Sequence, residues 1–107
     1  MTSKSEIAIW TAAGELFFEN QLMEAIEAFS QINSYSKVLF NLGMIYSFMG
    51  DYENADSMFE KSLRKDQFFA AAYFQKGLAL FELHEYDLAI RCYRFSLKVS
   101  RTILCMK

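Results

Sequence analysis

Proline is absent from this 107-residue chain, and glycine occurs only four times. Long helices are therefore permitted and tight turns are scarce, because these two residues are the main breakers of regular structure. The single histidine and the two cysteines, Cys92 and Cys105, form neither a CxxC pair nor a cluster of metal ligands. We expect no metal, no cofactor and no disulfide framework, which suits a reduced, cytoplasmic location.

Net charge is also small. The 11 basic and 13 acidic residues leave a formal charge of -2, which gives no general attraction to nucleic acid. The longest strongly apolar uncharged run, residues 38–50, contains Asn41 and Ser47 and is too short to span a bilayer. We therefore expect neither nucleic-acid binding nor insertion into a membrane.

Signatures of catalysis are missing as well. The patterns GxxxxGK[ST], GxGxxG and HExxH do not occur in the sequence. His84 stands at an expected turn, with no nucleophile motif and no pair of carboxylates placed to orient it. The sequence therefore predicts that the chain is not an enzyme.

Apolar residues are abundant, and they recur with a fixed period. Hydrophobic residues make up 53% of the chain and aromatic residues 17%, which is enough for a core. A segment that starts at residue 36 aligns without a gap with one that starts at residue 70, so equivalent residues lie 34 apart. This period with a helix–turn–helix pattern is typical of tetratricopeptide repeats (TPR). The sequence predicts an all-α TPR solenoid of three helix pairs.

Three positions in each unit are predicted to hold its two helices together. A glycine and an alanine are small where the helices approach closely, and a ring one turn beyond the alanine fills the space beside it. These structural residues are Gly43, Ala55 and Phe59 in one unit and Gly77, Ala89 and Tyr93 in the next.

An earlier, weaker unit precedes these two. Ala25 and Phe29 repeat the alanine-to-ring spacing, and Trp10 with Gly14 imitates the opening of a first helix. Gly14 to Ala25 is one residue shorter than Gly43 to Ala55, so we expect a different turn near residues 19–21. The units span about 4–33, 36–67 and 70–101 of a domain at 1–101, and a divergent tail follows at 102–107. Helices are expected near 4–18, 21–32, 36–49, 52–65, 69–83 and 86–100.

Stacked helix pairs offer two surfaces to a partner. One is a groove lined by the first helix of each unit, and the other is an edge that carries the loops between units, here residues 34–37, 65–69 and 99–102. A chaperone-tail receptor grips a carboxylate in its groove with lysine, arginine and asparagine. A generic adaptor that binds a peptide in the groove stays open as the alternative, although only Asn41 fits the clamp among the matching residues Thr11, Glu15, Asn41, Ala71 and Gln75.

Several longer strings resemble one family of TPR proteins. They are SKVLFNLGMIY, KDQFFAAAYFQKG and EYDLAI, together with EIAIW and MEAIEAFSQI in the first unit. Over about residues 5–101 the chain resembles the N-terminal TPR region of the NADPH oxidase activator family, which includes neutrophil cytosol factor two and a fungal oxidase regulator. This resemblance implies a module that binds a Rac-type small GTPase in its GTP form. It also implies a part in regulating superoxide production through the NADPH oxidase complex.

The resemblance also implies which residues bind the GTPase. The matching positions are Ser36 in NSYSK, Asp66 in RKDQF, Phe68 where the family commonly has histidine, and Arg101 after LKVS. They fall on the edge that the period defines. After Arg101 the chain reads TILCMK, whereas the family continues with a GTPase-binding insertion and a fourth unit. A shortened member is therefore expected, one that binds weakly or not at all and cannot activate an oxidase alone.

Overall fold

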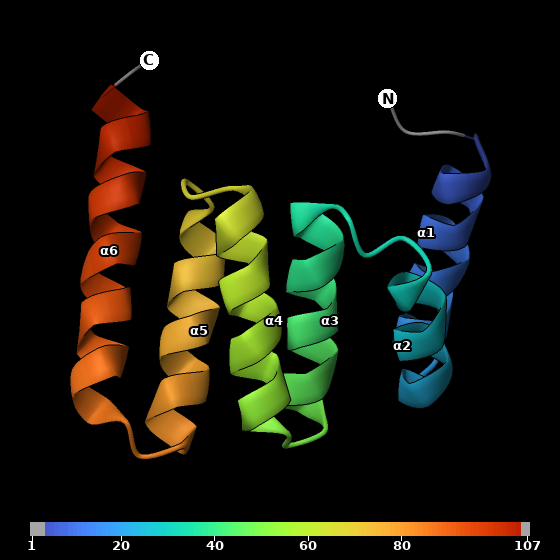
Figure 1. The fold of residues 1–107 in the computed structure, drawn as a ribbon, viewed down its shortest axis with the longest axis horizontal. Helices are drawn as coiled ribbons and strands as arrows, with labels where there is room; N and C mark the ends of the chain where they lie inside the picture. Colours follow the sequence, from blue (N-terminus) through green and yellow to red (C-terminus); the bar gives the residue numbers. More distant parts are fainter. Residues whose placement is uncertain (1–3, 106–107) are drawn as a thin grey trace.

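Helices in antiparallel pairs make up the fold, which confirms the predicted all-α repeat architecture (Figure 1). The computed structural model describes residues 4–105. Each helix packs against its partner in a pair, and α4 also packs along α5. The helices are α1 (Lys4–Phe18), α2 (Leu22–Ser30), α3 (Ser36–Phe48), α4 (Tyr52–Lys65), α5 (Ala70–Glu82) and α6 (Tyr86–Cys105).

The turn inside each pair has the same geometry in all three units. One residue adopts a positive φ, and the next donates its backbone N–H to a carbonyl five residues earlier at 2.8–2.9 Å, which closes the helix end. The residues with positive φ are Asn20 (64°), Gly50 (80°) and His84 (65°). The expectation of a different turn in the first unit is therefore wrong.

The spacing from glycine to alanine is one residue shorter in the first unit because Gly14 is not the residue at which its two helices pack. Counting back from the turn, Ala13 stands where Gly43 and Gly77 stand, and Ala13 is fully buried. A Cβ atom on Gly43 would come within 2.5 Å of the Phe59 ring, whereas nothing lies within 4 Å of one on Gly14. Gly14 therefore takes no part in helix packing, and alanine fills that role in the first unit.

A pair of aromatic rings joins the two helices of every unit at equivalent positions. The ring centroids lie 5.6–5.7 Å apart in all three pairs. The buried alanines Ala25, Ala55 and Ala89 allow the helices to approach beside these rings. The pairs are Trp10 with Phe29, Phe40 with Phe59, and Phe74 with Tyr93.

Helix α6 is longer than the sequence predicts. It continues past the expected end at residue 100 as far as Cys105, so residues 99–102 are helical and do not form a loop. No proline or glycine follows Arg101 to stop the helix. Within residues 4–105, none of the helices is both long and apolar enough to cross a membrane.

Candidate interaction surface

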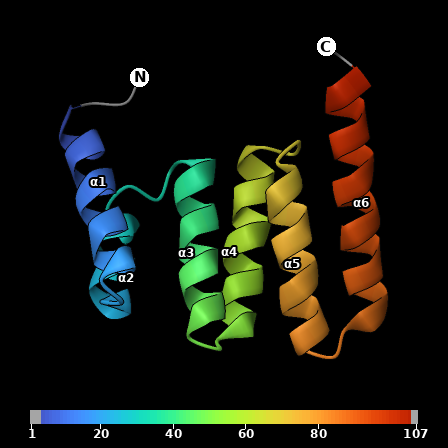
Figure 2. The same cartoon turned by 180° about the vertical axis from the view of Figure 1, so that it is seen from behind.

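The loops between units gather at one end of the molecule. The α2–α3 loop, the α4–α5 loop and the end of α6 point the same way in both views of the ribbon (Figures 1 and 2). The turns inside the three pairs lie at the opposite end. We call the surface formed by the start of α3, residues 66–69 and the last turns of α6 the loop edge.

Ser36 belongs to the loop edge, but its hydroxyl is engaged inside the protein. It donates to the carbonyl of Ser62 at 2.9 Å, and the hydroxyl of Ser62 donates in return to the carbonyl of Ser36 at 2.8 Å. In the next unit Ser96 donates to the carbonyl of Ala70 at 3.0 Å. In the second and third units these bonds tie the start of the first helix to the second helix, so Ser36 holds the edge in shape.

Asp66 shapes the loop that presents Phe68. It ends α4 in an extended conformation, and its Oδ1 accepts the backbone N–H of Phe68 at 3.1 Å. A short turn made in this way by an aspartate side chain is common where a chain reverses. Phe68 is 57% exposed. The ring of Phe69 turns inward instead, and its centroid lies 4.8 Å from that of the Phe40 ring. The sequence pair FF therefore divides between surface and core.

A hollow of about 230 Å³ lies beside Phe68 at the loop edge. The stacked rings of Tyr73 and Phe95 form part of it, with centroids 5.6 Å apart. Its other lining residues are Gln67, Phe68, Lys98, Val99 and Thr102. An apolar hollow rimmed by a lysine and by polar side chains is suited to a protein partner's side chain.

Arg101 lies close to this hollow along α6 and forms the end of a row of cations. The row is exposed, and none of its members makes an ion pair within the described residues. We call it the cationic stripe: Arg91, Arg94, Lys98 and Arg101. The small net charge of the whole chain does not reveal this stripe. The spacing of three, four and three residues could have revealed it, since such residues share one helix face.

The groove has a different character. Of the clamp positions, Thr11, Glu15 and Ala71 are exposed, and Asn41 and Gln75 are half-buried. A hollow of about 390 Å³ lies between α3 and α5, and no lysine or arginine lines it. A carboxylate has no cation to meet there.

A partly buried ion cluster joins α4 to α5. The ammonium of Lys76 lies 2.9 Å from an oxygen of Asp56 and 3.1 Å from one of Glu60. Burial alone would lower the pKa of Lys76, but the hydrogen bonds and charges of the two carboxylates outweigh it and raise the pKa. Burial also raises the pKa of the nearby Cys92 thiol, which therefore stays protonated and unreactive at neutral pH. This cluster fixes the position of the third unit beside the second.

Comparisons with known proteins agree with this architecture. A family model described as tetratricopeptide repeat matches residues 36–67 and again 70–102. Neutrophil cytosol factor 2 from Bos taurus is 29% identical over 92 residues, which are 85% of this chain and 18% of that protein. The NADPH oxidase activator of Dictyostelium discoideum is 27% identical over 77 residues, which are 71% of this chain and 13% of that protein.

The fold is also similar to that of solved structures. The second TPR of Spaghetti (RPAP3), bound to the HSP90 peptide SRMEEVD, superposes with a TM-score of 0.82 at 20% identity. The match covers 87% of this chain and 90% of that one. An identity this low shows a shared fold and no more.

Proposed function

The chain belongs to the tetratricopeptide repeat family, and from that premise we propose that its loop edge binds a Rac-type small GTPase in its GTP form. The similarity to neutrophil cytosol factor 2 and to an NADPH oxidase activator supports this choice of partner. A role in regulating superoxide production through an oxidase complex, in the cytosol, is part of the same proposal. The chain matches only 18% and 13% of those relatives, so their other parts are not represented in it.

The observation that carries the proposal is the combination of side chains at the loop edge. Phe68 offers an exposed ring beside a hollow, Asp66 an exposed carboxylate, and Arg101 a guanidinium without an internal partner among the described residues. A ring that anchors a contact, surrounded by charged groups, is the usual composition of a protein interface. We assign direct contacts to Asp66, Phe68 and Arg101, and assign to Ser36 the task of holding the edge.

The GTPase loaded with a non-hydrolysable GTP analogue, and separately with GDP, tests the proposal by calorimetric titration. We expect binding of the GTP form alone. Arg101→Glu should weaken it by about 30-fold or more, because a buried charge pair contributes about 2 kcal/mol or more. Arg94→Glu, on the same helix but away from the loops, is the matched control and should change affinity by less than about threefold.

Two results would overturn the proposal. One is equal binding of both nucleotide forms with no response to Arg101→Glu. The other is a loss of binding on Asn41→Ala or Gln75→Ala, with the loop-edge variants unaffected. The second result would favour the alternative function, an adaptor that binds a peptide in its groove; the RPAP3 repeat is likewise bound to a peptide.

A further inference from the structure

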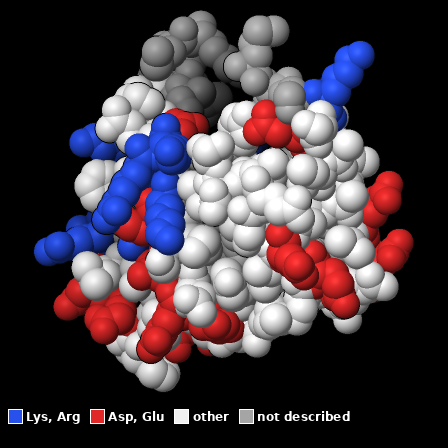
Figure 3. All heavy atoms as spheres, turned by 45° about the vertical axis from the view of Figure 1, so that its right-hand side comes forward, with Lys and Arg blue, Asp and Glu red and all other residues white. Residues whose placement is uncertain are grey.

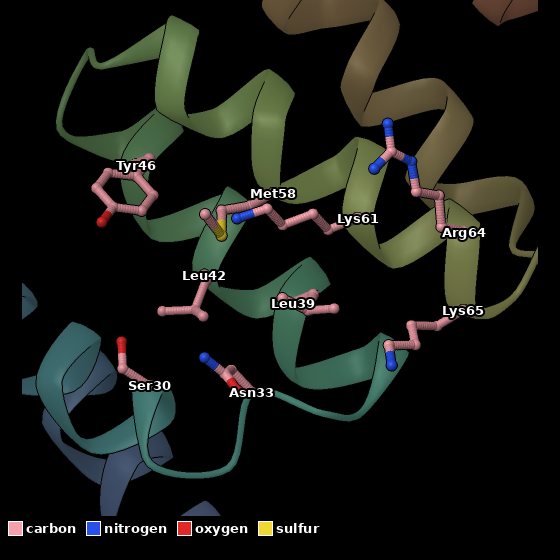
Figure 4. Close-up of a pocket in the computed structure, with 9 residues that line it drawn as sticks. All are labelled: Ser30, Asn33, Leu39, Leu42, Tyr46, Met58, Lys61, Arg64 and Lys65. Atoms are coloured by element: carbon pink, nitrogen blue, oxygen red, sulfur yellow. The ribbon is translucent and has the colours of Figure 1, made fainter.

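A third hollow, of about 360 Å³, opens where the first unit meets the second (Figure 4). Its floor is apolar: Leu39 and Leu42 are almost fully buried, and Met58 is partly buried beside them. Polar side chains stand around this floor. We call it the junction hollow; its lining residues are Ser30, Asn33, Leu39, Leu42, Tyr46, Met58, Lys61, Arg64 and Lys65.

One wall of the junction hollow carries three cations, all from α4. Lys61 stretches over the floor beside Met58, and the amine of Lys65 faces the α2–α3 loop, while the guanidinium of Arg64 turns away (Figure 4). The Nε of Arg64 lies 4.0 Å from the Oε1 of Glu60. Lys61 and Lys65 make no ion pair within the described residues. In the space-filling view, lysines and arginines cluster above a band of acidic residues (Figure 3).

None of the described residues that line this hollow is acidic, whereas the next junction has two acids, both on α4. There the acids of α4 hold Lys76, which is the counterpart of Leu42 one repeat earlier. Counting back from Asp56 and Glu60 to α2 gives Ile26 and Ser30. At these two positions, therefore, α2 offers no carboxylate to the cations of α4.

We propose that the junction hollow docks an acidic segment of a protein partner. A large apolar side chain of that segment enters over Leu39, Leu42 and Met58, and flanking carboxylates pair with Lys61 and Lys65. The volume suits one anchoring side chain rather than a folded ligand. Ammonium–carboxylate pairs at the rim give orientation and attract the segment from a distance.

The apolar floor decides between a protein segment and other anions. An anionic headgroup or a free phosphate would use the cations and leave the carbon surface of the floor facing water. A segment that carries both an apolar side chain and carboxylates covers the floor and satisfies the cations together. This site uses residues other than those of the loop edge, so it goes beyond the proposed GTPase contact.

The methyl group of Met58 provides a direct readout, because it lies in the hollow. The full chain with ¹³C-methyl methionine is titrated with a synthetic helical peptide that carries a leucine flanked on the same face by glutamates. We expect a saturable shift of the Met58 methyl signal, weakened by added salt. Two matched peptides serve as controls, one with glutamines for the glutamates and one with serine for the leucine, and both should bind at least about tenfold more weakly.

Charge reversal identifies the surface. Lys61→Glu with Lys65→Glu should weaken the peptide by about tenfold or more, while Arg91→Glu with Arg94→Glu, the same change on α6, should leave its affinity unchanged. Circular dichroism confirms that both variants fold. The proposal is overturned if the Met58 signal does not move, if the glutamine peptide binds equally well, or if only the α6 variant loses binding. It is also overturned if vesicles of anionic lipid shift the Met58 signal and the peptide does not.

Discussion

The two junctions between units use equivalent positions but different chemistry. In the second junction, Lys76 of α5 reaches Asp56 and Glu60 of α4. In the first, the counterpart of Lys76 is Leu42, and no charged pair crosses from α2 to α3 within the described residues. Helix α4 packs along α5 more extensively than α2 packs along α3. The repeat period thus determines the order of the units, while the junction side chains determine how tightly they stack.

This difference has a functional meaning. The tight junction keeps the α4–α5 loop and α6 in a fixed relation, which the proposed GTPase contact requires. The looser junction leaves a hollow that the described residues do not fill. Rigid presentation and open docking space therefore occur in one small domain, at two successive junctions.

The largest effect is expected when a residue of one junction is placed in the other. Leu42→Lys places in the first junction the lysine that the second one carries, but without acids to receive it. We expect a loss of about 2–5 kcal/mol in unfolding free energy, since a buried apolar side chain is lost and an unpaired charge takes its place. Urea denaturation measures it. A loss below about 0.5 kcal/mol, the size of an ordinary surface change, would mean that the two junctions are interchangeable.

Substitutions of two glycines test whether the first and second units use equivalent packing positions. Gly43→Ala should cost about 1–3 kcal/mol, because its Cβ would meet the buried Phe59 ring. Gly14→Ala should instead stabilise by about 0.5–1 kcal/mol, since that position is open and alanine favours the helix. Thermal melts of the two variants give both values. Equal effects at the two sites would contradict the assignment of Ala13 as the packing residue of the first unit.

Removing the lysine of the ion cluster tests what closes the second junction. Lys76→Met leaves Asp56 and Glu60 without their cation, and we expect a loss of about 1–2 kcal/mol. The value lies below that of a fully buried pair because the carboxylate side chains are 29% and 45% exposed. Replacing the cluster by its first-junction counterparts, Leu at 76, Ile at 56 and Ser at 60, should recover part of the loss. No recovery in urea denaturation would show that the cluster is more than a local ion pair.

The serine bonds predict a smaller effect. Ser62→Ala removes a fully buried hydroxyl that donates to the carbonyl of Ser36 and lies 2.9 Å from the Ser36 hydroxyl, and should cost about 1–1.5 kcal/mol. Ser96→Ala removes a single bond and should cost about 0.5–1 kcal/mol. The two variants are compared in the same denaturation series. A larger cost at Ser96 would reverse the expected order.

The smallest effect is expected from pH. Because the folded-state pKa of Lys76 is raised, its contribution to stability is fully present below the unfolded value near 10.5 and is lost as pH rises through the folded pKa. The difference in stability between wild type and Lys76→Met should therefore be constant from pH 7 to about 9.5 and shrink above about 10.5. A difference that already falls between pH 7 and 9 would point to another group.

The sequence predicts the positions that recur with the period and misses those that do not. Ala55, Phe59 and their counterparts were identifiable because each unit has to solve the same packing problem. The sequence pattern pairs Gly14 with Gly43, but the structure shows that Ala13 is the counterpart of Gly43, because alanine is small enough for that position. The period predicts another loop at residues 99–102, but α6 continues as far as Cys105.

The candidate site was harder to predict, for a physical reason. Asp56 and Glu60 are one helical turn apart, but their pairing with Lys76 depends on how α4 meets α5, which no repeat pattern specifies. The resemblance implies that Ser36 contacts a partner, which stays a prediction, but it does not reveal that the Ser36 hydroxyl bonds to Ser62. The junction hollow results from side chains of three helices and has no signature in any one of them.

The proposed function depends most directly on which residues of the chain contact the GTPase. Amide hydrogen exchange of the chain, alone and with the GTP-loaded Rac-type GTPase, measures this location residue by residue. We predict added protection in residues 66–69 and in the last turns of α6, with α1 and the groove positions Asn41 and Gln75 unchanged. Protection along α3 and α5 at those groove positions, with the loop edge still exchanging freely, would contradict the account.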